Sequence, residues 1–269
     1  MAKLPELKAI LFDLDDTLVP EMEPEREALL VVCGLVEAKY GADPEQMLKT
    51  IDESCHRLWA QWSTPSIYSE IAYAAWEGLW GPWDDPRYGL GNNEDTINQY
   101  KRDAWDEILS EYGVQDVELR DEIIEQHRVE RVKRLVPYDG VGEVLSQVGE
   151  TYPLAIVTNG SPAVQRFKLS EAGLSDYFEV VVASGDVGIG KPRPEPFTAA
   201  LEGLEVSPEE TVMIGNSWSS DIQGAANLNM PSIWFNAEGL PRPDKGSPPT
   251  IEISSVSEIL GAIEEVARS

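Results

Sequence analysis

The sequence predicts an α/β fold, a doubly wound parallel sheet whose first strand is followed by an inserted all-helical domain. Short apolar runs alternate with helical stretches from residue 137 onward, which is typical of strands joined by helical crossovers. One further apolar run, at residues 9–12, is separated from the others by a long helical stretch. We therefore expect a core formed by residues 1–18 with 137–269, and a helical domain at residues 19–136.

Length and composition are those of a globular protein. A chain of 269 residues with 42% hydrophobic content can bury a full core. No apolar run reaches the length of a membrane span, and the N-terminus lacks the apolar core of a secretory signal, so we expect a cytoplasmic protein with no membrane partner. Cys33 and Cys55 form no CxxC pair and predict small buried residues rather than a disulfide.

The charge balance is strongly acidic. The chain has 21 basic and 48 acidic residues, a net charge of −27. Such a surface repels nucleic acid and anionic membranes, so neither is expected as a partner. An anionic substrate would instead need local positive charge at its site. The acid excess is also similar to that of proteins from salt-loving organisms, although many ordinary proteins are acidic.

The predicted helical domain begins with two well-marked helices. Residues 24–40 have an early proline and an acidic first turn, and Gly41 is a stop signal. Asp43 is placed as the N-cap of a second helix that runs to about residue 62. The remaining elements of the domain are expected at these positions: helices at 66–80, 94–112 and 116–136, and a Gly- and Pro-rich loop at 81–91.

Six of the eight tryptophans fall inside this domain, at helical spacing that predicts a packed core rather than a ligand site. They are Trp59, Trp62, Trp76, Trp80, Trp83 and Trp105. Trp83, in the predicted loop, is the candidate to face a ligand. The two histidines, His56 and His127, lie far apart, which argues against a zinc site or a His-based triad.

A basic cluster lies in the last predicted helix of this domain and consists of Arg128, Arg131, Lys133 and Arg134. Its three arginines are spaced three residues apart and therefore lie along one side of the helix. One interpretation is that they pair with Glu125 and Glu130 on a solvated face. The other is that one of them turns toward an anionic substrate.

Strands and helices alternate in the rest of the chain. Each apolar strand is short and is followed by a turn signal and a helix. The predicted strands are residues 154–157, 178–183, 211–214 and 232–235, and the predicted helices are residues 139–149, 161–172, 195–204 and 221–228. A Pro- and Gly-rich loop at 236–250 and a final amphipathic helix from about residue 256 complete the chain.

Polar residues gather where the predicted strands end. Asp13 and Asp15 follow the first strand, and alternation would place both on the same side of the chain. On their own these acids fit either a ligand site or an Asp-rich turn with Asp16 as a capping residue. Other polar residues at or after strand ends are Thr158, Asn159, Lys191, Asn216 and Asp221. Parallel strands bring their carboxyl ends to one edge of the sheet.

In this order the residues resemble the four motifs of the haloacid-dehalogenase-like (HAD) hydrolase superfamily, over nearly the whole chain. The motifs are Asp13-x-Asp15-x-Thr17, the strand-ending Thr158, Lys191 before a proline, and the acidic stretch at 215–221. The resemblance implies a Rossmann-like core with a helical (C1-type) cap. It also implies a Mg²⁺-dependent phosphatase that hydrolyses a small phosphorylated metabolite through an aspartyl-phosphate intermediate.

The resemblance implies a role for each motif residue, because phosphoryl transfer needs a nucleophile, charge neutralisation and a proton for the leaving oxygen. Asp13 would be the nucleophile, and Asp15 would protonate the leaving oxygen and then accept a proton from water. Thr158, Asn159 and Lys191 would bind the phosphoryl group. The implied Mg²⁺ ligands are Asp13, the Asp15 backbone carbonyl, Asn216 and Asp221.

Asp15 bears on the choice of reaction. The family's dehalogenases lack this second aspartate, because a departing halide needs no proton, so its presence favours phosphate esters. The helical-cap phosphomutases of the family also carry it and stay an alternative. A non-enzymatic binding protein and a phospho-accepting signalling domain are further alternatives.

The acidic motif departs from the family pattern. Gly-Asp is usual where this chain has Gly215-Asn216, and asparagine offers an oxygen ligand without charge. Whether Asn216 or Asp221 would bind the metal directly is therefore open. The sequence predicts neither the substrate nor the oligomeric state.

Overall fold

The computed structural model describes residues 6–63, 67–81 and 94–268. The chain divides into two compact units. Met1–Pro20 and Pro137–Ser269 form the first, here called the core unit. Glu21–Val136 form the second, here called the inserted unit.

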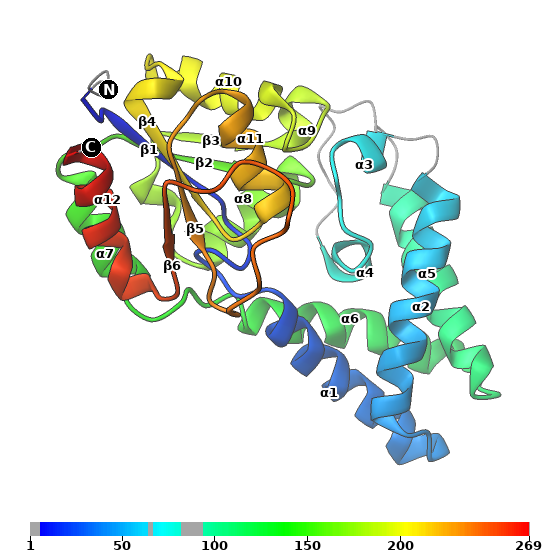
Figure 1. Cartoon of the computed structure of the whole chain (residues 1–269). Coiled ribbons are helices and arrows are strands. Elements are labelled where there is room, and N and C mark those ends of the chain that lie inside the picture. Colours follow the sequence, from blue (N-terminus) through cyan, green and yellow to red (C-terminus); the bar gives the residue numbers. More distant parts are fainter. Residues whose placement is uncertain (1–5, 64–66, 82–93, 269) are drawn as a thin grey trace. The chain divides into compact units, whose positions relative to one another are not determined.

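The core unit is built on a six-stranded parallel sheet in the order β3-β2-β1-β4-β5-β6 (Figure 1). The strands are β1 Ala9–Phe12, β2 Leu154–Thr158, β3 Val180–Ala183, β4 Thr211–Gly215, β5 Ser232–Phe235 and β6 Ile251–Ile253. The predicted parallel α/β sheet is thus confirmed. The prediction missed β6, because a three-residue run is too short to display a period.

β1 lies in the interior of the sheet. Ile10 is in register with Leu154 of β2 on one side and with Val212 of β4 on the other. All residues of β1 are buried, as expected for a parallel strand with both faces covered. The residues that follow β1 therefore emerge between the ends of β2 and β4.

Helices cover both faces of this sheet. α10 (Pro194–Leu204) and α11 (Gln223–Asn227) contribute Phe197, Ala200 and Ala225 to a buried cluster with Leu11 of β1. α7 (Val141–Gly149) and α12 (Ile259–Arg268) contact each other on the side opposite α10 and α11 (Figure 1). The shorter elements of this unit are α8 (Pro162–Glu171), α9 (Ser184–Val187), the 3₁₀ turns at Ser175–Tyr177, Pro208–Glu210 and Val256–Glu258, and a π turn at Trp218–Ile222.

The inserted unit consists of helices in its described part. They are α1 Met22–Tyr40, α2 Pro44–Ser63, α3 Ile67–Glu70, α4 Glu77–Trp80, α5 Glu94–Glu111 and α6 Val117–Lys133. α1 packs against α2 and α6, and α5 packs against α2, α4 and α6. Gly41 ends α1 in a left-handed conformation with φ 75°, so this predicted stop is confirmed.

One predicted helix of the inserted unit is wrong. Where one helix was predicted over residues 66–80, the described residues 67–80 contain two short helices, α3 and α4. Ala72, between them, has φ 53° in the left-handed region, which interrupts a right-handed helix. Of the predicted loop at 81–91, only Gly81 is among the described residues, and Trp83 lies outside them.

The tryptophans of the inserted unit largely form its core. Trp80 and Trp105 are fully buried, and the ring of Trp59 packs against the rings of Tyr73 and Tyr100. The packed-core prediction is confirmed for these three tryptophans, whereas Trp76 is half-buried. The side chain of Trp62 lies outside the description. Cys33 and Cys55 are buried and form no disulfide, as predicted.

The basic cluster of α6 is only partly solvated. Arg134 Nη1 pairs with Glu130 Oε2 at 2.5 Å, as one interpretation predicted. Arg131 contradicts that interpretation because it is fully buried, with ion pairs to Glu21 at 2.7 Å and Glu25 at 2.8 Å. α6 packs on α1, and this contact turns Arg131 toward the two carboxylates near the start of α1.

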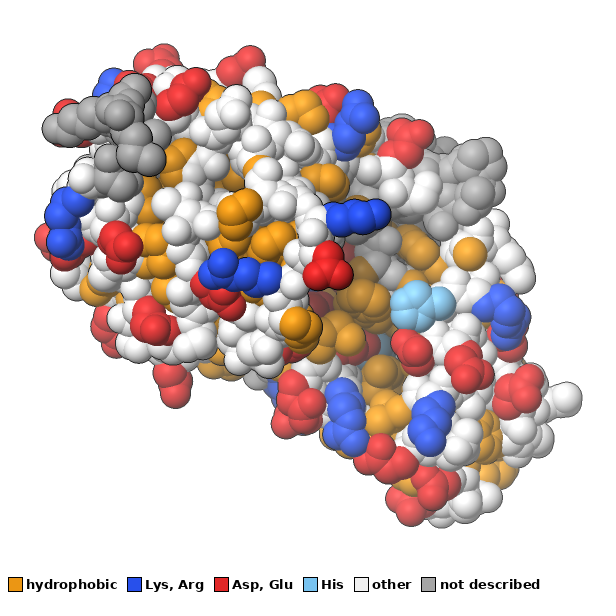
Figure 2. All heavy atoms as spheres, in the orientation of Figure 1, with side chains coloured by type: hydrophobic (Ala, Val, Ile, Leu, Met, Phe, Trp, Pro, Cys, Tyr) orange, Lys and Arg blue, Asp and Glu red, His pale blue; other side chains and the backbone are white. Residues whose placement is uncertain are grey.

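The surface reflects the acidic composition. Acidic side chains spread over the visible face of each unit, with isolated Lys and Arg side chains between them (Figure 2). None of the helices in the described part of the chain combines the length and the apolar character that a membrane span requires.

Candidate active site

Asp13 is the first polar residue after β1 and lies at the carboxyl end of the sheet. Its side chain is buried, and its two oxygens have different partners. Oδ1 accepts a hydrogen bond from Lys191 Nζ at 2.7 Å, and Oδ2 accepts one from Thr17 Oγ1 at 2.9 Å. The carboxylate is therefore held in one orientation by contacts at both oxygens.

Lys191 connects three segments of this edge. Its Nζ donates to Asp13 Oδ1, to Asp221 Oδ1 at 2.6 Å and to the backbone oxygen of Val157 at 2.7 Å. Burial lowers the pKa of Lys191, but the two adjacent carboxylates outweigh this effect and hold the pKa above its ordinary value. The ammonium group is thus a fixed positive charge beside Asp13.

Asn159 holds the backbone of Lys191 in place. Its Oδ1 accepts from the Lys191 N–H at 2.7 Å, and its Nδ2 donates to the Lys191 carbonyl at 3.3 Å. Asn159 immediately follows β2, so this pair of bonds joins the end of β2 to the loop that carries Lys191. The sequence assigned Asn159 to phosphate binding, and the structure places its amide on this loop.

Thr158 is the last residue of β2 and is buried. Its Oγ1 donates to Gln165 Oε1 of α8 at 3.0 Å. β2 is paired with β1, which ends just before Asp13, and Lys191 donates to the carbonyl of Val157 next to Thr158, so Thr158 belongs to the same edge of the sheet. Gln165, which is fully buried, did not stand out in the sequence.

Asp221 is fully buried at the start of the helical segment that follows β4. Its Oδ1 accepts from Lys191, and its Oδ2 accepts from the Ser217 N–H at 2.9 Å. Gly215, the last residue of β4, makes room for this carboxylate, because a Cβ there would overlap it. Asn216 lies nearby, with its Oδ1 at 3.3 Å from Thr17 Oγ1.

Asp15 lies two residues beyond Asp13 and is partly exposed, with 25% of its side chain accessible. Its Oδ1 is 2.9 Å from Nζ of Lys168, a fully buried residue of α8. Asp16, with φ 56°, turns the chain directly after it. Sequence reasoning missed Lys168. The sequence did offer a signal, because Lys168 follows Val164 by four residues and Gln165 by three. This spacing puts Lys168 on the helix face that is buried.

The comparisons with known proteins decide the family. Residues 7–229 match the family model of the haloacid dehalogenase-like hydrolases. The chain belongs to this family. The match spans Asp13, Lys168, Lys191 and Asp221, and it confirms the resemblance that the motifs indicated.

Relatives of the chain in this family include named phosphatases. The phosphoserine phosphatase of Thermus thermophilus is 31% identical over 257 residues, which is 94% of this chain and 98% of that protein. The human N-acylneuraminate-9-phosphatase is 25% identical over 267 residues, 98% of this chain and 96% of that protein. Among solved structures, a 2-haloacid dehalogenase from Pseudomonas syringae superposes with a TM-score of 0.63 at 25% identity, covering 96% of this chain and 99% of that one.

The electrostatics of this family site favour a bound cation. Burial is the main cause that raises the pKa of Asp13 to about 6, with Lys191 opposing the increase and the Asp221 carboxylate contributing to it. Two buried carboxylates thus share one lysine, which leaves an excess of negative charge. Within the described residues no three His, Cys, Asp or Glu side chains cluster as metal ligands. The oxygens of Asp13, Asp221 and Asn216 nevertheless form a donor set of the kind that Mg²⁺ prefers.

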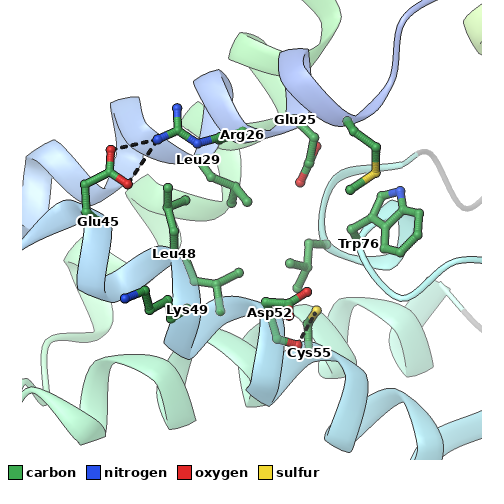
Figure 3. Close-up of a pocket in the computed structure, with 12 residues that line it drawn as sticks. Glu25, Arg26, Leu29, Glu45, Leu48, Lys49, Asp52, Cys55 and Trp76 are labelled. Carbon is green, nitrogen blue, oxygen red and sulfur yellow. Dashed lines mark hydrogen bonds and ion pairs between the residues drawn. The ribbon is translucent and has the colours of Figure 1, made fainter. Parts of the chain in front are cut away.

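The inserted unit of this family member contains a cavity of its own. The cavity has a volume of about 370 Å³ and lies between α1 and α2, with Trp76 at one side (Figure 3). Leu29 and Leu48 line its apolar wall, and the carboxylate of Glu25 points into it (Figure 3). The ion pair of Arg26 with Glu45 lies at its other end. The cavity therefore combines an apolar wall with a few charged groups, as small-molecule sites do.

Proposed function

We propose that this protein is a Mg²⁺-dependent phosphomonoester hydrolase that acts on a small phosphorylated metabolite through an aspartyl-phosphate intermediate on Asp13. The family membership and the named phosphatase relatives support a hydrolase of phosphate esters. The observation that carries the finer proposal is the contact of Asp13 with Lys191, with Asp15 two residues further on. These groups match the needs of phosphoryl transfer, a nucleophile, a fixed positive charge and a proton donor.

In the first step the Asp13 carboxylate attacks phosphorus, and the bond from phosphorus to the ester oxygen breaks. Asp15 gives its proton to the departing oxygen, which leaves as an alcohol. In the second step Asp15 accepts a proton from water, the water oxygen attacks phosphorus, and inorganic phosphate leaves as the Asp13 carboxylate is restored. Lys191 supplies positive charge beside the phosphoryl oxygens throughout.

Asp13, Asp221 and the Asp15 backbone carbonyl would hold Mg²⁺, with Asn216 as a neutral candidate ligand. When bound, the ion would allow the carboxylate and the phosphate, two anions, to approach each other. With a net charge of −27, the protein repels anionic substrates at long range. The positive charge of Lys191 and of the bound ion would therefore matter more for substrate binding than it would in a neutral protein.

Asp15 favours phosphate esters over the halide displacement named for the Pseudomonas syringae structure. A halide leaves as a stable anion and needs no proton, whereas an alkoxide does. A partly exposed aspartate beside the nucleophile is therefore expected in a phosphatase, whereas the departure of a halide does not require it.

Phosphate release tests the proposal. The protein is assayed with p-nitrophenyl phosphate, phosphoserine, N-acylneuraminate 9-phosphate and a panel of sugar and nucleotide phosphates, each with Mg²⁺ and with a chelator. We expect turnover that requires Mg²⁺, loss of turnover in Asp13→Asn, and retention in the neighbouring Asp16→Asn. Acid quenching during turnover followed by mass spectrometry should locate the phosphoryl group on Asp13.

The outcomes separate the alternatives. Turnover that survives Asp13→Asn contradicts the nucleophile assignment. A folded protein without phosphate release under any condition contradicts the phosphatase and favours a phosphomutase or a binding protein.

A further inference from the structure

Lys168 is a lysine whose burial needs an explanation. It lies on α8 with none of its side chain exposed, and its Nζ is 2.9 Å from Asp15 Oδ1. Burying an ammonium group is costly unless it is paired with an opposite charge. An apolar residue at this position of α8 would pack without that cost, so the charge itself indicates a function.

α8 is also tied to the site at a second point. Gln165 lies three residues before Lys168, on the same side of the helix, and accepts a hydrogen bond from Thr158 at the end of β2. The helix that carries Lys168 is therefore fixed against the strand end where the phosphoryl group is proposed to bind. Lys168 occupies a set position relative to Asp13 and Thr158.

Asp13 and Asp15 are each paired with a different lysine. Lys191 holds Asp13, and Lys168 holds Asp15. The aspartates are only two residues apart and would repel each other at close range. Because the two lysines lie on different elements, each holds one carboxylate in a separate position. Asp13 is then placed to attack phosphorus, and Asp15 is placed near the leaving oxygen.

We propose that Lys168 is a positioning residue that holds the Asp15 carboxylate where it can transfer a proton to the leaving oxygen. This inference rests on the proposed phosphatase function. A general acid must lie within hydrogen-bond distance of the leaving oxygen, and a displacement of about 1 Å costs roughly 100-fold in rate. Lys168 itself touches neither substrate nor phosphorus in this assignment.

The dependence of rate on the leaving group tests the proposal. p-Nitrophenolate leaves readily without a proton, whereas the alkoxide of an alkyl phosphate such as phosphoserine does not. We expect Lys168→Met to lower kcat/KM for the alkyl ester by about 10–100-fold and for p-nitrophenyl phosphate by less than about 3-fold. Lys168→Arg, which keeps the charge, should restore part of the loss.

Arg166 provides a matched control on the same helix. It is a cation two residues away, but it pairs with Asp186 at 2.9 Å and with the backbone oxygen of Val181. Arg166→Gln should leave both substrates within about 2-fold of the wild type. An equal loss on both substrates in Lys168→Met would mean a merely structural role and would overturn the proposal. A full effect of Lys168→Met in an Asp15→Asn background would overturn it as well.

Urea unfolding provides a readout that does not depend on activity. If Lys168 and Asp15 are coupled, the unfolding midpoint of Lys168→Met with Asp15→Asn shifts by less than the sum of the two single shifts. Additive shifts contradict the coupling, whatever the reaction proves to be. If the shifts are non-additive but the protein hydrolyses no phosphate ester, Lys168 and Asp15 are coupled and the proposed function is wrong. The positioning role is then overturned together with that function.

Discussion

Gly215 is the residue on which the position of Asp221 depends. A Cβ at this point of β4 would overlap the Asp221 carboxylate, which lies directly against the backbone there. Asp221 in turn shares Lys191 with Asp13. A single methyl group at Gly215 would therefore displace a carboxylate two contacts away from the proposed nucleophile.

We expect Gly215→Ala to lower kcat by about 100-fold or more while the protein stays folded, because misplacement by about 1 Å is enough for such a loss. Phosphate release and circular dichroism on the same preparation measure both effects. Gly261→Ala is the matched control, since a Cβ there meets no atom within 4 Å, and it should leave activity unchanged. Wild-type activity in Gly215→Ala would mean that Asp221 is not needed at its observed position.

At the scale of single elements, α1 and α6 are joined by buried charges. Arg131 of α6 pairs with Glu21 and Glu25, and its guanidinium lies 4.8 Å from the centre of the Trp80 ring. His127, one turn earlier on α6, lies 3.0 Å from Glu25. Side chains of this kind satisfy one another only while the two helices keep their register.

Arg131→Leu should destabilise the protein by about 3–5 kcal/mol, because it leaves two buried carboxylates without the guanidinium. Urea unfolding followed by circular dichroism measures this loss. Arg134→Gln removes a partly exposed arginine of the same helix and should cost no more than about 1 kcal/mol. Equal effects of the two changes would contradict the role assigned to the buried cluster.

Like Arg131 of α6, Lys101 of α5 is a buried cation of the inserted unit. Its Nζ donates to the carbonyl of Gly81 at 3.1 Å. Burial, together with the nearby charge of Arg128 and against the opposing charge of Glu125, lowers the pKa of Lys101 to about 8. Below pH 8 both the folded and the unfolded chain hold the proton. Between pH 8 and the ordinary pKa of 10.5 only the unfolded chain still holds it, so stability from this residue rises with pH.

The stability of the wild type relative to Lys101→Met should therefore increase from pH 8 to pH 10, by at most about 1.4 kcal/mol per pH unit. Urea unfolding of both proteins at each pH gives the difference. A constant difference between the wild type and Lys101→Met would contradict the lowered pKa.

At the scale of the whole molecule, the net charge of −27 opposes the compact state through self-repulsion. Added salt screens this repulsion over a Debye length of about 10 Å at 0.1 M. We expect the thermal midpoint to rise by a few degrees between about 0.05 and 1 M NaCl, and by a similar amount in KCl. A thermal midpoint that stays constant or falls with added salt would contradict the view that self-repulsion lowers the stability of the folded protein.

The sequence predicted the features of the fold that are periodic or local. The parallel strands, the helix stop at Gly41 and the family motifs could all be read from spacing and residue type. Lys168 and Arg131 could not be assigned, because a buried and a solvated cation look alike until the packing partner of the helix is known. Their partners, Asp15 and Glu21, lie far away in the sequence. Ala72 was likewise missed, since alanine gives no local signal for a left-handed residue.

The interior position of β1 has a consequence for how the protein is made. β1 is translated first, yet its neighbours β2 and β4 come after the whole inserted unit. About 200 residues separate Phe12 from Gly215, which is roughly 10–40 s of synthesis at about 5–20 residues per second. Until β2 emerges, the apolar strand β1 has no neighbour to pair with, and until β4 emerges it has only one of its two neighbours. The nascent chain thus has a long interval in which chaperones can bind β1, and no catalysis can begin until the last part of the site emerges.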